Sequence, residues 1–309
     1  MKPGRLFLTL ACTAVSAAVL GAAWWVVALG PVPKAEDFEV STQVVDREGR
    51  LLRAYAIADG RWRLPATLDG VDHRYVEMLL AYEDKRFREH RGVDLWAMGR
   101  AAEQWIANKR IVSGGSTITM QVARLMEPRA ERTIVAKLRQ IVRAVEIERT
   151  LTKDQVLSLY LSMAPYGGNL EGVRAASLAY FGKEPRRLSL GEAALLVALP
   201  QSPEVRRPDR SAIAARRARD RVLDRIAASG RIPADEIALA KQEPVPGARK
   251  PMPALAPHAA DQAIAAVPSR KLHRLTIDAS FQKSLEDLAR ERARILGPDI
   301  AVEIGRAHV

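Results

Sequence analysis

The sequence is poor in several residue types, and each shortage excludes a class of protein. Cys12 is the single cysteine in 309 residues, so the chain cannot form an internal disulfide or a cysteine-based zinc site. The five histidines include no closely spaced pair, and this argues against a transition-metal cage. No internal repeat and no second long apolar run follows the first thirty residues, which excludes repeat proteins and multi-span membrane proteins.

Positive charge is in excess. The chain has 48 Lys and Arg against 36 Asp and Glu, a formal net charge of +12. Such a balance favours a polyanionic partner, which can be nucleic acid, an anionic membrane surface or a phosphorylated ligand. No nucleic-acid-binding motif accompanies the charge, so we expect no nucleic acid partner. Hydrophobic residues make up 48% of the chain, which excludes a mostly disordered protein.

One long apolar run opens the chain. Residues 6–29 contain no charged side chain, and as a helix they would span roughly 36 Å, enough to cross a bilayer core. Lys2 and Arg5 precede the run, which places residues 1–5 in the cytoplasm by the positive-inside rule. We therefore predict a single-pass transmembrane anchor at residues 6–29. A cleaved signal peptide is the alternative, although this run is longer than a normal signal core.

The rest of the chain predicts a mainly α body with a small β element. Residues 40–45 and 51–57 alternate as two short strands do, and the pattern becomes helical from Asp72 onward. Thr152 with Gln155 and Ser189 with Glu192 form capping boxes, which mark the first residues of helices. Further boundaries are predicted for a body at residues 40–240, a Pro- and Ala-rich linker at 241–271, and a strand followed by a helix within 272–309.

Glu83 is the first candidate for chemistry. It follows an apolar helical stretch at residues 76–82, and a carboxylate in such a place can act as a general acid or base. A single Glu at the end of a helix is more often a solvated surface residue, so position alone does not decide its role. His90, shortly afterwards, is expected to be structural.

A second candidate region begins with two glycines. Ser116, Thr117 and Gln121 follow Gly114 and Gly115, and such a segment can hold phosphate or sugar oxygens, or can simply cap a helix. Two or three converging cations would offset the charge of a diphosphate. Basic residues suited to this task, which cannot all share one helical face, are Arg124, Arg129, Arg132, Lys137, Arg139 and Arg143.

These features occur in a fixed order. The motifs are Glu83-Asp84-x-x-Phe87-x-x-His90-x-Gly92, Gly115-Ser116-Thr117 with Gln121, Arg132-Thr133 with Lys137, Lys153-x-x-Val156-Leu157-x-x-Tyr160-Leu161, and Arg219-x-x-Val222-Leu223. Together they resemble the motifs of the peptidoglycan glycosyltransferases, glycosyltransferase family 51, as found in class A penicillin-binding proteins of the 1C type. The chain departs from the family pattern where Met120 replaces Gln, Ala136 replaces Arg, Gln140 replaces Glu and Ser162 replaces Asn.

The resemblance implies a lysozyme-like, mainly helical fold and an inverting glycosyl transfer. Glu83 would be the general base that takes the proton of the acceptor hydroxyl. Arg124, Arg132 and Lys137 would stabilise the diphosphate leaving group. Ser116, Thr117 and Gln121 would order the donor site, and Gln140, which can both donate and accept hydrogen bonds, suits contact with the diphosphate oxygens. A divalent cation such as Mg²⁺ is compatible with this chemistry, while no organic cofactor and no metal site built from protein side chains is expected.

The same resemblance implies the partners and the location. The substrates would be lipid II and an undecaprenyl-diphosphate-linked glycan, at the bacterial inner membrane with the catalytic domain in the periplasm, where other cell-wall synthesis proteins could join it. Residues 272–309 resemble the truncated start of a transpeptidase region. Ser280-x-x-Lys283 matches a serine acylation motif, but no K-T-G triplet exists, so we expect no transpeptidase activity.

Two other functions remain open at this point. A lytic transglycosylase or lysozyme would share the fold and use Glu83 to cleave glycan, but it would leave the basic run without a purpose. A non-catalytic membrane scaffold of cell-wall synthesis is suggested by Gln140, where the family carries a carboxylate.

Overall fold

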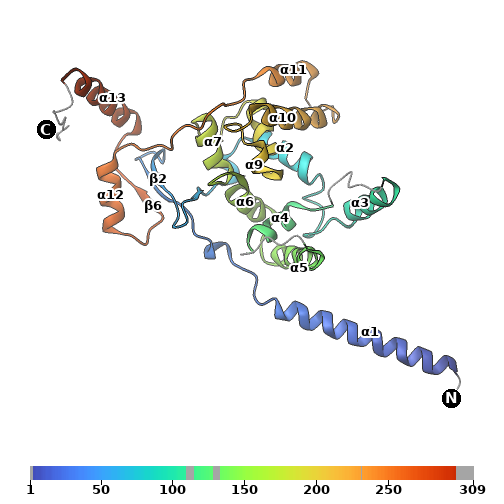
Figure 1. The fold of residues 1–309 in the computed structure, drawn as a ribbon. Coiled ribbons are helices and arrows are strands. Elements are labelled where there is room, and N and C mark those ends of the chain that lie inside the picture. Colours follow the sequence, from blue (N-terminus) through green and yellow to red (C-terminus); the bar gives the residue numbers. More distant parts are fainter. Residues whose placement is uncertain (1–2, 109–114, 128–132, 231, 297–309) are drawn as a thin grey trace.

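Most of the ordered chain is helical. The computed structural model describes residues 3–108, 115–127, 133–230 and 232–296, and Figure 1 shows the arrangement of its elements. The α-helices are α1 (Pro3–Ala28), α2 (His73–Glu83), α3 (Leu95–Asn108), α4 (Ile118–Leu125), α5 (Ile134–Thr150), α6 (Lys153–Met163), α7 (Val173–Phe181), α8 (Leu190–Ala198), α9 (Pro203–Arg206), α10 (Ala212–Ala227), α11 (Ala234–Gln242), α12 (Pro257–Ala266) and α13 (Ala279–Leu296). Short 3₁₀ turns are η1 (Ala35–Asp37), η2 (Leu68–Gly70) and η3 (Leu199–Gln201). The predicted mainly α class is confirmed, and the lysozyme-like arrangement stays a prediction.

Two small sheets accompany the helices. The first has the order β2 (Leu51–Tyr55), β1 (Thr42–Val45), β6 (Leu272–Arg274), with β1 antiparallel to β2 and parallel to β6. The second has the order β3 (Trp62–Arg63), β5 (Leu170–Glu171), β4 (Pro165–Gly167). The hairpin expected near residues 40–57 is confirmed, as are the strand and helix expected after residue 272.

The parallel strand β6 joins the β1–β2 hairpin to the later part of the chain, in one unit with α12 and α13 (Figure 1). Asp46, in the hairpin turn, is fully buried and accepts hydrogen bonds from the backbone N–H groups of Ala279, Arg50 and Glu48. Burial alone would raise the pKa of Asp46, but these bonds and the Arg50 side chain lower the pKa to about 2. The carboxylate therefore ties the hairpin to the start of α13.

Local sequence accounts for where the body helices begin and how deeply they lie. The capping boxes at Thr152 and Ser189 are both formed, and they start α6 and α8 as expected. Apart from Glu192 in its capping box, helix α8 consists of buried apolar residues and a glycine, which suits a central helix, and it packs against α2 and α10. Its end at Ala198 leads directly into η3, which contains Pro200.

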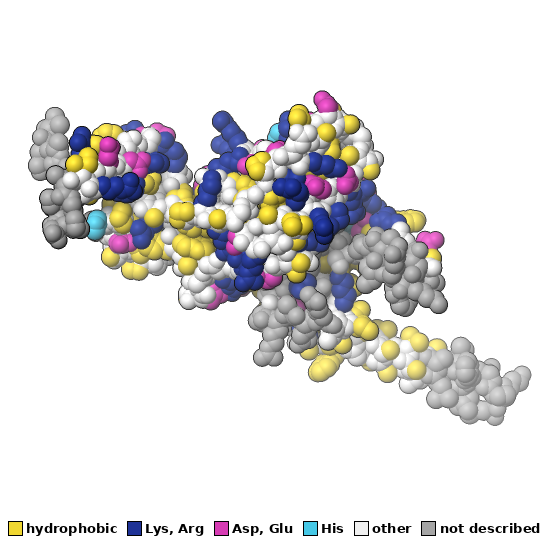
Figure 2. Space-filling model, turned by 45° about the horizontal axis from the view of Figure 1, so that its top comes forward, with side chains coloured by type: hydrophobic (Ala, Val, Ile, Leu, Met, Phe, Trp, Pro, Cys, Tyr) yellow, Lys and Arg dark blue, Asp and Glu magenta, His cyan; other side chains and the backbone are white. Residues whose placement is uncertain are grey.

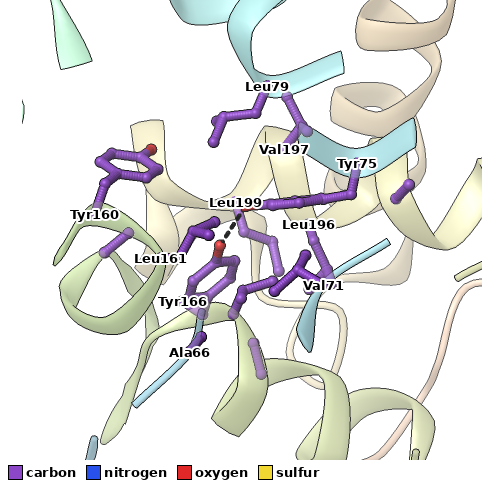
Figure 3. Packing of buried hydrophobic residues seen from close by; sticks show 14 of the residues in the cluster. Ala66, Val71, Tyr75, Leu79, Tyr160, Leu161, Tyr166, Leu196, Val197 and Leu199 are labelled. Carbon is purple, nitrogen blue, oxygen red and sulfur yellow. Dashed lines mark hydrogen bonds between the residues drawn. The ribbon is translucent and has the colours of Figure 1, made fainter. Parts of the chain in front are cut away.

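Three tyrosines lie in the core, and one of them, Tyr75, belongs to α2. The hydroxyls of Tyr75 and Tyr166 are 2.7 Å apart, and Tyr180 donates its hydroxyl hydrogen to the Tyr166 carbonyl at 2.9 Å. Figure 3 shows Tyr75 and Tyr166 meeting among Leu196, Leu199 and other apolar side chains. Burial raises the pKa of Tyr75 and Tyr166 well above the usual range of tyrosine. Because the hydroxyls satisfy one another, the core tolerates them at little cost.

The first helix extends away from the body (Figure 1). Among the residues that the structure describes, no helix combines the length and the apolarity needed to cross a membrane, so the anchor at residues 6–29 stays a prediction. Past the end of α1, the Leu29 and Gly30 carbonyls accept hydrogen bonds from the guanidinium of Arg143 in α5. Arg143 also pairs with Glu146 at 2.9 Å. A buried, charge-assisted contact thus joins the first helix to the body.

Gly92 is the point where three segments meet. Its φ is +85°, a left-handed conformation that favours glycine. A Cβ at this position would lie 2.5 Å from the Ala144 carbonyl oxygen in α5. The Gly92 carbonyl accepts a hydrogen bond from Thr117, at the start of α4, at 2.6 Å. The loop after α2 can therefore approach α4 and α5 only because this residue has no side chain.

We expect Gly92→Ala to destabilise the protein by about 3 kcal/mol, because strain at positive φ and overpacking against backbone add. Gly60→Ala is the matched control: φ is +81° there, but no atom lies within 4 Å of the added Cβ, so a loss of only about 1 kcal/mol is expected. Urea unfolding followed by tryptophan fluorescence measures both changes. Equal losses in the two variants would show that the close approach at Gly92 contributes nothing.

Candidate active site

Glu83 is the last residue of α2, and its carboxylate is held by two side-chain amides. Gln121 Nε2, on α4, donates to Glu83 Oε2 at 2.9 Å, and Gln201 Nε2, on η3, donates to Glu83 Oε1 at 2.7 Å. Glu83 is partly exposed. The three side chains come from parts of the chain up to 118 residues apart, so only the tertiary fold assembles them.

The next residue, Asp84, fixes the position of the end of α2. It is buried, and both of its oxygens lie 3.0 Å from His90 Nε2. Asp84 Oδ2 also accepts from the backbone N–H of Ile118, the first residue of α4, at 3.0 Å. A carboxylate at a helix N-terminus satisfies an otherwise unpaired N–H and interacts favourably with the helix dipole. Asp84 therefore locks the end of α2 to the start of α4, and His90 has the structural role expected of it.

Two hollows lie close to the Glu83 carboxylate. One, of about 350 Å³, is lined by Glu83 itself together with Ser116, Lys85, Arg100 and Arg225. The other, of about 600 Å³, is lined by Gln121, Gln201 and Arg124 among others. Figure 2 shows Lys and Arg side chains over much of the visible face of the helical body. The Glu83 carboxylate thus lines a hollow with more cations than carboxylates, while its two amide partners line a second hollow in which arginines and glutamates are equal in number.

A second polar cluster joins α5 to the segment before α4. Lys137 Nζ donates to Ser116 Oγ at 2.6 Å and lies 3.5 Å from the side-chain oxygen of Gln140, the limit of a hydrogen bond. Burial lowers the pKa of Lys137, and the nearby positive charge of Arg124 lowers it further. Two cations held so close together, one of them half-buried, make a place where a polyanion is favoured.

The structure therefore groups most of the residues expected in the site. Glu83 and Gln121 are in contact, Ser116, Lys137 and Gln140 form the second cluster, and Arg124 is near enough to influence Lys137. Arg132 lies outside the described residues. Their roles with substrate stay predictions.

Thr117 has a different position from the one its candidate role suggested. It is buried, its hydroxyl oxygen accepts from the Met120 N–H as the N-cap of α4, and its hydroxyl hydrogen goes to the Gly92 carbonyl. Both hydrogen-bonding functions are used inside the protein. The N-cap alternative considered for this segment is thus realised at Thr117, and direct contact with substrate there stays a prediction.

Gln201 was not anticipated from the sequence. Arg206, which donates to Gln201 Oε1 at 3.0 Å, was not anticipated either. The only local signal is that a glutamine follows Pro200 at the end of an apolar helix, and many helices end in this way.

The described residues do not form a metal site. Within the described ranges, no group of three or more His, Cys, Asp or Glu side chains is placed to hold an ion. Asp84 is committed to His90 and Ile118, and Gln140 stands where a carboxylate was expected. Glu83 alone is too few ligands for Mg²⁺.

Comparison with known proteins decides the family. The transglycosylase family model matches residues 48–227, which is more than half of the chain. The chain belongs to the transglycosylase family. The family expected from the ordered motifs is thereby confirmed.

Several curated members of this family are similar over long stretches. Penicillin-binding protein 1C of Escherichia coli strain K12 is 43% identical over 268 residues, which cover 87% of this chain and 34% of that protein. Penicillin-binding protein 1A of the same strain is 37% identical over 194 residues, covering 63% of this chain and 22% of that protein. The chain thus spans about a third or less of these relatives.

Among solved structures, the crystal structure of penicillin-binding protein 1A from Haemophilus influenzae matches 82% of this chain and 29% of that chain. Its sequence identity is 18% and its TM-score is 0.39, a likeness too low to support an argument about the fold.

Gln140 gives a direct test of the second cluster. We expect Gln140→Glu to raise KM for the lipid-linked donor that the family resemblance implies about tenfold, with little change in kcat, because a buried carboxylate beside Lys137 would pair with the ammonium and offset its charge toward phosphate. Gln242→Glu, the same charge change at an exposed site on α11, is the control. Steady-state kinetics decide the matter, and a strong rise in turnover for Gln140→Glu would mean that the natural glutamine impairs the site.

Proposed function

We propose that the chain is a peptidoglycan glycosyltransferase, which polymerises lipid II into glycan strands by inverting transfer from an undecaprenyl-diphosphate-linked donor. The observation that carries the proposal is the Glu83 carboxylate in a hollow that Lys85, Arg100 and Arg225 also line, while Lys137 binds Ser116 of the same hollow. A proton acceptor beside several cations suits a transfer whose leaving group is a diphosphate. The membership of the transglycosylase family supports the same reaction.

Glu83 acts as the general base. Its carboxylate accepts the proton of the acceptor sugar hydroxyl while the hydroxyl oxygen attacks the anomeric carbon of the donor. The bond from that carbon to the phosphate oxygen breaks, and its electron pair leaves with the diphosphate. Attack from the face opposite the leaving group inverts the anomeric centre. The proton on Glu83 then passes to water.

Cationic side chains stabilise the departing diphosphate. Lys137 and Arg124 lie close together beside Ser116, and none of the described residues forms an ion pair with Arg124 or Lys137. Their charges are therefore available to phosphate oxygens, whose negative charge grows in the transition state. A divalent cation such as Mg²⁺ would have to be brought with the diphosphate, and no step depends on it.

We also propose that the body sits at the outer face of the bacterial inner membrane. The exposed side chains of α1 include Val15, Val19, Leu20 and Val27, and the first turns of α5 expose Ile134, Val135 and Leu138. Arg143 of α5 holds the end of α1, so both apolar surfaces belong to one region of the molecule. Such surfaces suit a protein whose substrates are anchored in lipid.

We expect Glu83→Gln to abolish lipid II polymerisation, since an amide cannot accept the proton, while the fold stays intact. Glu77→Gln, an exposed carboxylate on the same helix, should keep full activity. Gel analysis of glycan strands made from labelled lipid II measures both variants. Turnover of Glu83→Gln above a few per cent of the unsubstituted protein would refute the assignment. If the unsubstituted protein cleaved mature glycan and did not polymerise lipid II, a lytic enzyme would be favoured.

Topology is tested separately. Reporter proteins fused after Pro33 should be active only when they are of a kind that works in the periplasm, because the positive residues before the apolar run orient it with its N-terminus inside. Alkaline phosphatase and a cytoplasm-dependent fluorescent protein, fused at the same residue, form the matched pair. Fluorescence without phosphatase activity would overturn the proposed orientation.

A further inference from the structure

Gln201 donates a hydrogen bond to the general base Glu83, and none of the five sequence motifs includes Gln201. The inference rests on the proposed role of Glu83. Gln201 and Gln121 each donate one hydrogen bond, to different oxygens of the Glu83 carboxylate. A carboxylate has about four acceptor sites on its two oxygens. One site on each oxygen therefore stays available to a substrate hydroxyl, while rotation of the group is restrained from both sides.

The orientation of the Gln201 amide is fixed by a third side chain. Arg206 Nη1 donates to Gln201 Oε1 at 3.0 Å and to the Ala198 carbonyl at 2.7 Å. A guanidinium can only donate hydrogen bonds, so the amide atom that faces it must be the oxygen. The Gln201 nitrogen then has to face Glu83. Burial lowers the pKa of Arg206, yet arginine keeps its charge at any physiological pH.

Other groups around Glu83 cannot take over this task. Asp84 is committed to His90 and to the Ile118 N–H. Tyr75 uses its hydroxyl on Tyr166, and the buried Tyr160 hydroxyl makes no hydrogen bond to any described residue. The cations that line the smaller hollow with Glu83 are Lys85, Arg86, Arg100 and Arg225, and Arg124 lines the larger one. None of these side chains makes a hydrogen bond to Glu83 within the described ranges.

We propose that Gln201 is a positioning residue for Glu83, oriented by Arg206, and that it keeps the carboxylate turned toward the acceptor hydroxyl. Gln201 is exposed, so the fold does not depend on burying its side chain. The hydrogen bonds from Arg206 to Gln201 and from Gln201 to Glu83 connect the end of α9, through η3, to the end of α2. They link the general base to a segment more than a hundred residues away in sequence.

The kinetic test uses two substitutions at one position. Gln201→Ala should lower kcat about tenfold and leave KM within about twofold, because a hydrogen bond to a charged group is lost without loss of substrate contacts. Gln201→Glu should move the acidic limb of the pH–rate profile upward by about one pH unit, since a second carboxylate beside Glu83 favours protonation. Arg206→Met should shift kcat in the same direction as Gln201→Ala. Gln242→Ala and Gln242→Glu, at an exposed glutamine on α11, are the matched controls.

A second measurement does not depend on catalysis. Carbodiimide coupling of an amine to Glu83, mapped by mass spectrometry, reports the protonated carboxyl as a function of pH. We expect the labelling curve of Gln201→Glu to lie at higher pH than that of the unsubstituted protein, and the Gln242 variants to match the unsubstituted protein.

The two readouts separate the two hypotheses. Shifted labelling in a protein that does not polymerise lipid II would support the positioning role of Gln201 and overturn the proposed function. Identical labelling curves and pH profiles for Gln201→Glu and the unsubstituted protein would overturn the positioning role, whatever the activity. A rise in KM with unchanged kcat in Gln201→Ala would likewise overturn it, because that result assigns Gln201 to substrate binding.

Discussion

The buried carboxylate of Asp84 is the interaction on which the site depends. It joins the end of α2 to His90 and to the first N–H of α4, so the residue before it, Glu83, and the residue one turn into α4, Gln121, are held at hydrogen-bonding distance. Gly92 and the Thr117 cap close the same junction from the other side. A carboxylate buried with all its partners in place is rigid, and rigidity is what a general base requires.

Three buried tyrosines, Tyr75, Tyr166 and Tyr180, show how polar groups are accommodated in the apolar core next to this site. Tyr75 and Tyr166 bind each other, and Tyr180 binds the Tyr166 backbone, so no hydroxyl among these three is left without a partner. The buried helix α8 packs against α2 and leads into η3, which contains Pro200 and Gln201. The interior therefore determines where the second amide of the site emerges.

The basic residues of the chain have two different roles. Many arginines serve the fold: Arg219 is buried and donates to the Lys241 and Glu243 carbonyls at 2.6 Å, at the end of α11. Arg143 does the same for the segment after α1. By contrast, Lys85, Arg100 and Arg225 line the hollow that contains Glu83 and Ser116, and Arg124 lines the other. The composition alone does not distinguish these uses, because both need the same side chain.

The serine acylation pattern near the end of the sequence also acquires a local explanation. Asp278 accepts from the N–H groups of Ser280 and Phe281 and from the Ser280 hydroxyl, so it caps α13. Lys283 pairs with Asp287 one turn further along, at 2.6 Å. Ser280 and Lys283 thus make local contacts that stabilise α13, which is consistent with a chance match to the pattern.

Local signals in the sequence were sufficient for much of this protein. The capping boxes determined where α6 and α8 begin, the alternation near residues 40–57 determined the hairpin, and five ordered motifs determined the family, since each depends on neighbours within a few residues. Three features depended on the tertiary structure alone. Strand β6 pairs with β1 across more than two hundred residues, the Thr117 hydroxyl donates to the Gly92 carbonyl, and Gln201 reaches Glu83 from η3. Such contacts are set by how whole helices pack, and no spacing along the chain records them.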